Sequence, residues 1–110
     1  MAIYMLEVAY TAETWAAMVR KPQNRVEAIR PAIEALGGKV LNSFFAFGEY
    51  DAVLILEYPD EVTAAAFQIA AAAGGAAKAT RTTPLMSMDD GIAAFKKAGT
   101  ITYIPPAKAN

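Results

Sequence analysis

The sequence predicts one α+β domain with a ferredoxin-like βαββαβ order, an antiparallel sheet and an extra C-terminal helix. Two observations predict this fold class. Stretches rich in β-branched and aromatic residues alternate with stretches of helical spacing or high alanine content, and Gly-Gly pairs follow two of the helical stretches. This alternation fits a split βαβ arrangement with the helices on one face of the sheet. A chain of 110 residues has room for one such domain with a modest core.

The first half of the chain predicts a strand followed by helical segments. Residues 3–10 are apolar, β-branched or aromatic apart from one glutamate, which is typical of a strand, and residues 11–21 open with an N-cap candidate and predict a short helix. Pro22 suits the first turn of a longer helix that contains Pro31 and ends at Gly37-Gly38. The apolar positions of this longer helix recur at helical spacing: Val26, Ile29, Ile33 and Leu36.

The middle of the chain predicts a hairpin, a helix and a fourth strand. Residues 39–47 and 52–58 are the two arms of the hairpin, and residues 48–51 form its turn. Pro59-Asp60 begins an alanine-rich helix over residues 61–73, which a glycine pair ends. Residues 77–85 then predict the last strand of the sheet.

The C-terminal segment predicts one more helix and a tail. Ser87 begins a capping pattern, and the helix that follows runs to Lys97 before Gly99. We therefore expect a domain over residues 1–99 and a tail over residues 100–110. Residues 100–104 have strand character, which predicts a short extra strand on the edge of this sheet or of a neighbour's.

Both faces of the predicted sheet are apolar, and this predicts a partner chain. On residues 39–47, for example, alternation places Val40 and Phe44 on one face and Leu41 and Phe45 on the other. The chain's own helices cover one face, and a large apolar face is rarely left in water. The simplest cover is a second copy related by a two-fold axis, so we expect a homodimer or a higher homo-oligomer. The alternative is that the extra helix or the tail covers the second face within one chain.

Composition excludes several functional classes. The net charge of −1 lacks the basic excess of a nucleic-acid-binding protein. The chain contains neither cysteine nor histidine, which argues against disulfides, haem and zinc, and we expect no cofactor and no metal site. The N-terminal sequence does not resemble a signal peptide and no apolar run has membrane-spanning length, so we expect a cytoplasmic protein with no membrane partner.

The hairpin motif resembles that of a known family. Gly48, Tyr50 and Asp51, followed by an apolar strand and residues 57–60 (Glu-Tyr-Pro-Asp), resemble the GYD-domain family, which is named for its glycine-tyrosine-aspartate motif. The resemblance covers roughly residues 1–98 and implies a ferredoxin-like fold of the dimeric α+β barrel group, but no reaction. Further matching positions are Tyr4, Thr11, Pro22, Arg25, the junction at residues 36–40, and Arg81-Thr82-Thr83.

Five residues are candidates for ligand binding, and each also has a structural interpretation. Glu7 and Glu57 fall on one alternation and would share a proton in an apolar cavity, or they lie in water or pair with Arg81 or a lysine. Tyr50 and Asp51 stand at the hairpin, where turn chemistry is the favoured interpretation and a cavity mouth is the functional one. Arg81 is suited either to clamp a ligand carboxylate or to form a salt bridge.

Gly48 and Asp51 also carry structural predictions. We expect Gly48 to adopt a backbone conformation that is unfavourable for other residues, and Asp51 to accept hydrogen bonds within the hairpin.

Two functions from different classes follow. The favoured one is a homo-oligomeric module that binds a small apolar or carboxylate ligand or interacts with itself, without established catalysis. The alternative is a cofactor-independent enzyme, similar to monooxygenases or isomerases of this fold, whose carboxylate and tyrosine groups act in a cavity between sheet and helices.

Overall fold

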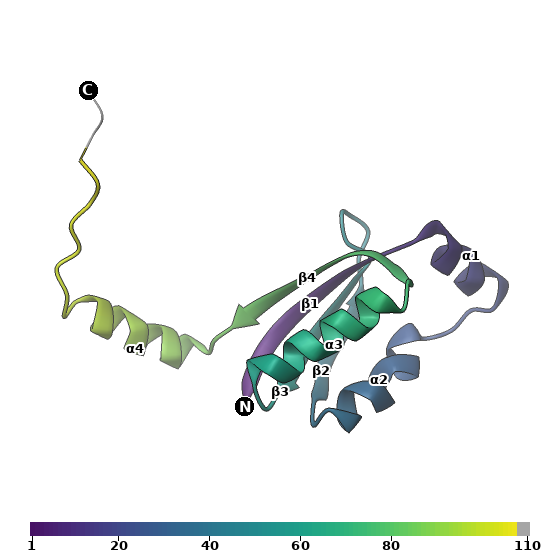
Figure 1. Cartoon of the computed structure of the whole chain (residues 1–110), viewed down its shortest axis with the longest axis horizontal. Helices are drawn as coiled ribbons and strands as arrows, with labels where there is room; N and C mark the ends of the chain where they lie inside the picture. The colour runs from purple at the N-terminus through teal and green to yellow at the C-terminus, as the bar shows by residue number, and fades with distance from the viewer. Residues whose placement is uncertain (108–110) are drawn as a thin grey trace.

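The computed structural model describes residues 1–107, which form a four-stranded antiparallel sheet and four helices. The strand order is β2-β3-β1-β4, so the first strand in sequence lies at the centre of the sheet and confirms the split βαβ arrangement. Helices α2 and α3 cover one face, and α4 projects away from the domain (Figure 1). The elements are β1 Ala2–Tyr10, α1 Ala12–Arg20, α2 Arg25–Ala35, β2 Lys39–Phe45, β3 Ala52–Tyr58, α3 Glu61–Ala73, β4 Ala77–Leu85 and α4 Met88–Ala98.

Side-chain caps define where the helices begin. Thr11 accepts a hydrogen bond from the backbone N–H of Thr14 at the start of α1, and Asp60 accepts one from Thr63 at the start of α3. The prediction that Pro22 occupies the first turn of α2 is wrong. Asn24 caps the backbone N–H of Val26, so α2 begins at Arg25, three residues later.

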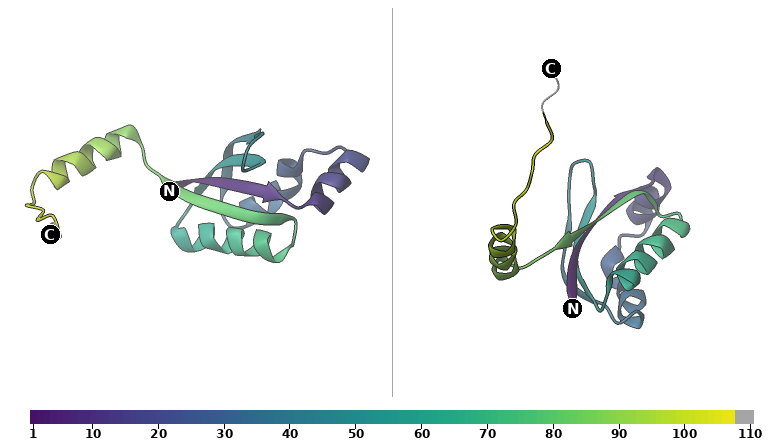
Figure 2. Two further views of the ribbon diagram at one scale, coloured as in Figure 1. Left: turned by 90° about the horizontal axis from the view of Figure 1, so that it is seen from above. Right: turned by 60° about the vertical axis from the view of Figure 1, so that its left-hand side comes forward.

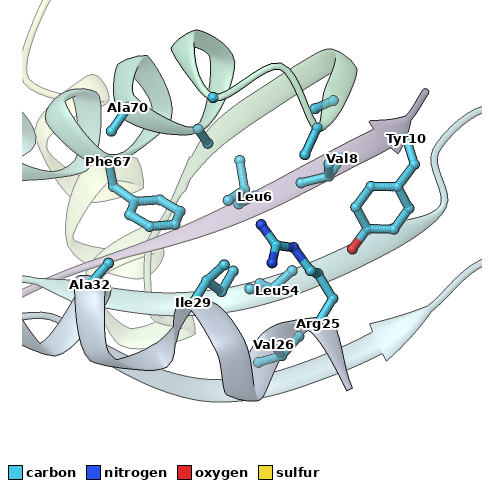
Figure 3. A pocket seen from close by; sticks show the side chains of 14 residues that line it. Leu6, Val8, Tyr10, Arg25, Val26, Ile29, Ala32, Leu54, Phe67 and Ala70 are labelled. Atoms are coloured by element: carbon cyan, nitrogen blue, oxygen red, sulfur yellow. The ribbon is translucent and has the colours of Figure 1, made fainter. Parts of the chain in front are cut away.

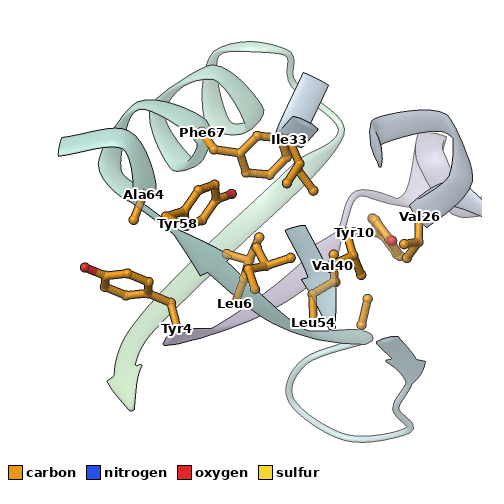
Figure 4. Packing of buried hydrophobic residues seen from close by; sticks show 12 residues of the cluster. Tyr4, Leu6, Tyr10, Val26, Ile33, Val40, Leu54, Tyr58, Ala64 and Phe67 are labelled. Atoms are coloured by element: carbon orange, nitrogen blue, oxygen red, sulfur yellow. The ribbon is translucent and has the colours of Figure 1, made fainter. Parts of the chain in front are cut away.

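The core fills the layer between the sheet and helices α2 and α3 (Figure 4). Leu6, Leu54 and Leu56 extend from the two central strands toward Ile33 of α2 and Phe67 of α3, and all five side chains are buried. A buried aliphatic or aromatic side chain contributes about 1.5–3 kcal/mol to folding, so this layer supplies most of the stability of the domain.

One part of the core leaves no room for even a methyl group. A Cβ atom at Gly38 would lie 2.6 Å from Cε1 of Tyr58 and 2.9 Å from Cγ2 of Ile33. The Tyr58 ring is buried beside Tyr4, at 6.1 Å between ring centroids, and its hydroxyl has no hydrogen-bond partner among the described residues. Burial raises the pKa of Tyr58 to about 12.

The opposite face of the sheet, which we call the open face, is not covered by any of the helices within residues 1–107 (Figure 2). Its central residues are apolar and only partly buried, which confirms the predicted second apolar face. Strand alternation and register assign the following residues to it: Ile3, Met5 and Glu7 of β1, Val53, Ile55 and Glu57 of β3, Lys39, Asn42 and Phe44 of β2, and Arg81, Thr83 and Leu85 of β4.

Strand β2 is shorter and less regular than predicted. It ends at Phe45 instead of residue 47, and its register shifts between Val40 and Asn42. Because of this irregularity, Val40 is buried in the core while Phe44 lies opposite Val53 on the open face and is 63% exposed. The prediction that Val40 and Phe44 share one face is therefore wrong.

The C-terminal segment does not complete the sheet. Residues 100–104 have no regular structure and add no strand to the sheet of their own chain, so pairing with the sheet of a neighbour stays a prediction. Helix α4 has no buried residue, so it does not cover the open face of its own chain. The radius of gyration is 18.1 Å, compared with about 13 Å expected for a compact domain of this length, which reflects the projecting segment.

Strand β4 forms one edge of the sheet and contains Pro84, which lies opposite Tyr4 of β1. Across residues 1–107, no helix has the length and hydropathy needed to cross a membrane.

Candidate functional site

A cavity of about 240 Å³ lies between the central strands and helices α2 and α3. Leu6 and Val8 of β1 and Leu54 of β3 form its floor, with Ile29 on the α2 side and Phe67 on the α3 side. The cavity exists because the helices carry small side chains where they face each other. These small residues are Ala32 on α2 and Ala70 and Ala71 on α3.

Arg25 is the one charged residue that lines this cavity among the described residues. It stands at the first position of α2, and Figure 3 shows its guanidinium extending over the cavity toward Leu6 and Ile29. Within residues 1–107 the one ion pair joins Arg30 to Glu27 at 2.8 Å on the outer surface of α2, so Arg25 forms no ion pair with a described carboxylate. A half-buried guanidinium over an apolar surface provides a site for an anion.

Tyr10 supplies the second polar group, and its hydroxyl points toward Arg25 (Figure 3). The backbone N–H of Tyr10 donates to Oδ2 of Asp51 at 2.8 Å, and the ring packs edge-on against Trp15 at 5.4 Å between centroids. Burial raises the pKa of Tyr10; Arg25 opposes this shift and Asp51 adds to it. The phenol is therefore neutral at physiological pH and is able to donate a hydrogen bond to a ligand.

The sequence comparison decides the family. The profile of the GYD domain matches residues 4–95, which is most of the chain. The chain belongs to the GYD-domain family. No curated protein matches it.

Among solved structures, this GYD-domain protein is similar to the crystal structure of MtbAldR, with a TM-score of 0.60 and 19% sequence identity. The match covers 78% of this chain and 52% of the other, so the chain spans about half the length of MtbAldR. At this identity the likeness concerns the fold, and it agrees with the ferredoxin-like α+β topology.

The motif of the GYD family joins the hairpin to the central strand. Asp51 receives the Tyr10 N–H on its carboxylate, donates its own N–H to the carbonyl of Val8 at 2.8 Å and accepts from the N–H of Ala46 at 2.8 Å. The carboxylate bond is thus a tertiary bond to β1, and the prediction that it stays within the hairpin is wrong. Asp51 fixes the end of the strand from which Tyr10 enters the cavity.

The other two motif residues contribute less to the cavity. Gly48 is exposed, has no positive φ and has open space where a Cβ would stand, so the predicted unfavourable backbone conformation is wrong. Tyr50 is half-buried and does not line the cavity.

Glu7, Glu57 and Arg81 lie on the open face, away from the cavity of this GYD-domain protein. Glu57 is the register partner of Ile3 and Glu7 that of Val53, so the two carboxylates stand four positions apart, or about 13 Å along the strands. They therefore do not share a proton within one chain. Arg81 lies opposite Glu7 on β4.

The cavity residues Arg25 and Tyr10 were not among the predicted site residues. Arg25, Ile29 and Ala32 follow helical spacing, and an arginine on the apolar stripe of a helix was the available signal. Tyr10 lies on the same alternation as Leu6 and Val8, but its place beside Arg25 depends on how α2 packs against the sheet. Among the described residues, no group of three acidic, histidine or cysteine side chains is placed to hold a metal ion.

Proposed function

We propose that this GYD-domain protein is a homo-oligomeric module that binds a small ligand with an apolar body and a carboxylate. The observation that carries the proposal is the guanidinium of Arg25 over an apolar cavity, without an ion-pair partner among residues 1–107. The apolar lining takes the body of the ligand, while Arg25 and the neutral hydroxyl of Tyr10 bind its carboxylate. A dry cavity of about 150 Å³ accommodates benzene, so 240 Å³ suits a ring or a short alkyl chain that carries an acid group.

Binding is better supported than catalysis. General acid–base chemistry near neutral pH needs a group whose pKa lies near 7. Among the described residues that line the cavity, none is a carboxylate, and the pKa of Tyr10 is raised above its ordinary value of 10.0. Two of the candidate groups of the enzyme hypothesis, Glu7 and Glu57, lie on the other face of the sheet.

The homo-oligomeric part of the proposal rests on the open face. Ile3, Met5, Val53 and Ile55 form an apolar surface at the centre of a sheet that the chain's own helices leave uncovered. Because every copy carries the same surface, a two-fold axis brings two such faces together and removes both from water.

Ligand binding is testable with Trp15, the only tryptophan of the chain, which packs against Tyr10. Fluorescence titrations would compare benzoate and hexanoate with the neutral benzamide and hexanamide. We expect both acids to bind at least about tenfold more tightly than their amides, because a hydrogen bond to a charged group contributes about 1.5–3 kcal/mol. Equal affinity for acid and amide would overturn the assignment of a carboxylate.

Three variants test the cavity. Arg25→Gln should abolish the preference for acids over amides, and Ala71→Leu should weaken binding of all four probes by filling the cavity. Arg30→Gln is the matched control, because Arg30 lies on the same helix, pairs with Glu27 and does not line the cavity. If Arg25→Gln and Arg30→Gln behave alike, the guanidinium over the cavity is not the binding group.

The oligomer is testable by size-exclusion chromatography with light scattering at micromolar concentration. We expect a dimer or a multiple of it for the natural chain and a smaller species for Ile55→Glu, which buries a charge on the open face. Val62→Glu is the control, since Val62 is a 74% exposed apolar residue on the outer side of the domain, in α3. A natural chain that is monomeric at this concentration would contradict the proposal.

A further inference from the structure

Helix α4 presents an apolar stripe that the described part of its own chain leaves exposed. Met88, Ile92 and Phe95 recur at spacings of four and three residues, so they lie on one side of the helix. They are 89%, 50% and 76% exposed. Of the charged residues of the helix, Asp90 and Lys97 lie on the opposite side, while Asp89 and Lys96 flank the stripe.

The ends of α4 are well formed, although its long side has no partner. The hydroxyl of Ser87 accepts the N–H of Asp90 at 3.1 Å, and the N–H of Gly99 donates to the carbonyl of Phe95 at 3.1 Å. An isolated helix of 11 residues is nevertheless only marginally stable in water, because most helical stability in proteins comes from packing of the apolar side. A second surface therefore has to cover Met88, Ile92 and Phe95 if α4 is to persist.

The position of α4 favours the open face of another copy as that surface. Only Met86 and Ser87 separate α4 from β4, and the helix lies on the side of the sheet opposite to α2 and α3 (Figure 2). It also lies beyond the end of its own sheet, where Leu85 pairs with Ile3. A subunit seated on the open face would thus meet the arm of its neighbour.

Both surfaces carry charges of both signs, so each offers ion-pair partners to the other. Glu7 and Glu57 stand among the apolar residues of the open face, and Lys96 and Lys97 end the helix. None of these four takes part in an ion pair within residues 1–107. Arg81 and Lys39 on the open face likewise complement the acidic first turn of α4, which carries Asp89 and Asp90.

We propose that α4 is an exchange arm that packs through Met88, Ile92 and Phe95 on a second copy of this chain seated on the open face. This inference rests on the homo-oligomer of the proposed function. Each copy supplies one arm and one open face, so a two-fold axis satisfies both surfaces reciprocally. The arm extends the interface beyond the sheet and holds the two subunits together over a longer contact.

The first test compares variants on the two sides of α4. Ile92→Asp should weaken the dimer at least about tenfold in sedimentation or light-scattering dilution series, because it places a charge in the contact. Ala93→Asp adds the same charge on the polar side of the helix and should leave the dissociation constant unchanged. An equally tight dimer for Ile92→Asp would overturn the exchange arm and leave the dimer itself standing, whereas a monomeric natural chain would overturn both.

The second test identifies the surface that α4 touches. Because the chain has no cysteine, Ala93→Cys accepts a single nitroxide label. The nitroxide-labelled chains are mixed with ¹⁵N-enriched chains that carry no nitroxide. We expect broadened amide signals of β1 and β3 in the ¹⁵N chains and hydrogen-exchange protection of α4 that rises with protein concentration. Undiminished amide signals throughout the ¹⁵N chains, or protection of α4 that appears only with anionic lipid vesicles, would overturn the proposal.

Discussion

Helices α3 and α4 have similar lengths and similar residues at their ends, but α3 is packed against the sheet and α4 is exposed. They have 13 and 11 residues, each begins at a capping side chain, Asp60 or Ser87, and each ends at a glycine. Yet α3 buries Ala64 and Phe67 against the sheet, while α4 buries nothing. Caps and glycines therefore determine where a helix begins and ends. Whether the helix is stabilised within one chain depends on the surface that covers its apolar side.

The largest expected contrast is between the two phenylalanines of these helices. Phe67→Ala removes a buried ring and should lower the free energy of unfolding by about 3–5 kcal/mol. Phe95→Ala removes an exposed ring and should change it by no more than about 0.5 kcal/mol in dilute protein. Urea unfolding below the dissociation concentration measures both; equal effects would mean that α4 packs on its own chain.

Replacing a glycine by alanine should have opposite effects on stability in the core and in α4. Gly38→Ala forces a methyl group against Tyr58 and Ile33 and should cost about 1–3 kcal/mol. Gly91→Ala in α4 meets no atom within 4 Å and should stabilise the helix by about 0.5–1 kcal/mol, because alanine favours helix more than glycine does. Thermal unfolding measures the loss for Gly38→Ala, and helical circular dichroism measures the gain for Gly91→Ala. A stabilised Gly38→Ala would show that the core layer is loosely packed.

Asp51→Ala should destabilise the domain by about 1–2 kcal/mol, because the N–H of Tyr10 loses its acceptor. Since Tyr10 packs against Trp15, tryptophan fluorescence should change as well. Glu49→Ala is the control, an exposed carboxylate two residues away in the same loop. The interpretation fails if both variants melt together with unchanged spectra.

Tyr58→Phe tests how the buried Tyr58 hydroxyl of the core affects the pH dependence of folding stability. The pKa of Tyr58 is about 12 in the folded chain and 10.0 in its ordinary state, so between these values the folded chain retains a proton that the unfolded chain releases. Stability is therefore unaffected by this group below pH 10 and falls as the pH rises from 10 to 12. In melting curves at pH 9 to 11.5, Tyr58→Phe should reduce this loss, and an unchanged slope would contradict it.

The smallest effect is expected at Gly48. Gly48→Val should change the free energy of unfolding by less than about 0.5 kcal/mol, because a side chain there meets open space and the backbone is not left-handed. The melting temperature, which is the measurement, should therefore change little. A loss as large as that for Gly38→Ala would indicate that the hairpin loop contacts another subunit.

The boundaries of several elements were predictable because their signals are local. The strand at Ala52–Tyr58, the helix at Glu61–Ala73 and the strand at Ala77–Leu85 begin and end where the sequence predicts. The failures have nonlocal causes. The register shift in β2 moves Phe44 to the open face, and the β-like residues after Gly99 do not pair with the sheet of their own chain.

The candidate site was less predictable than the fold. Glu7 and Glu57 share a face, as alternation predicts, but the register separates them along the sheet. Arg25 and Tyr10 come from positions 15 residues apart, and their convergence depends on how α2 packs on the sheet. Composition excluded many kinds of chemistry, but composition has no information about which polar side chains meet at one cavity.

The proline on the edge strand has a consequence for how this chain behaves at high concentration. Pro84 has no N–H, and proline in a sheet is tolerated where that group would face solvent. An incoming strand would find an interrupted row of donors along β4, which disfavours growth of the sheet into a continuous cross-β fibre. Replacement of this one imino acid by valine would expose a continuous edge in a protein that is otherwise rich in apolar surface.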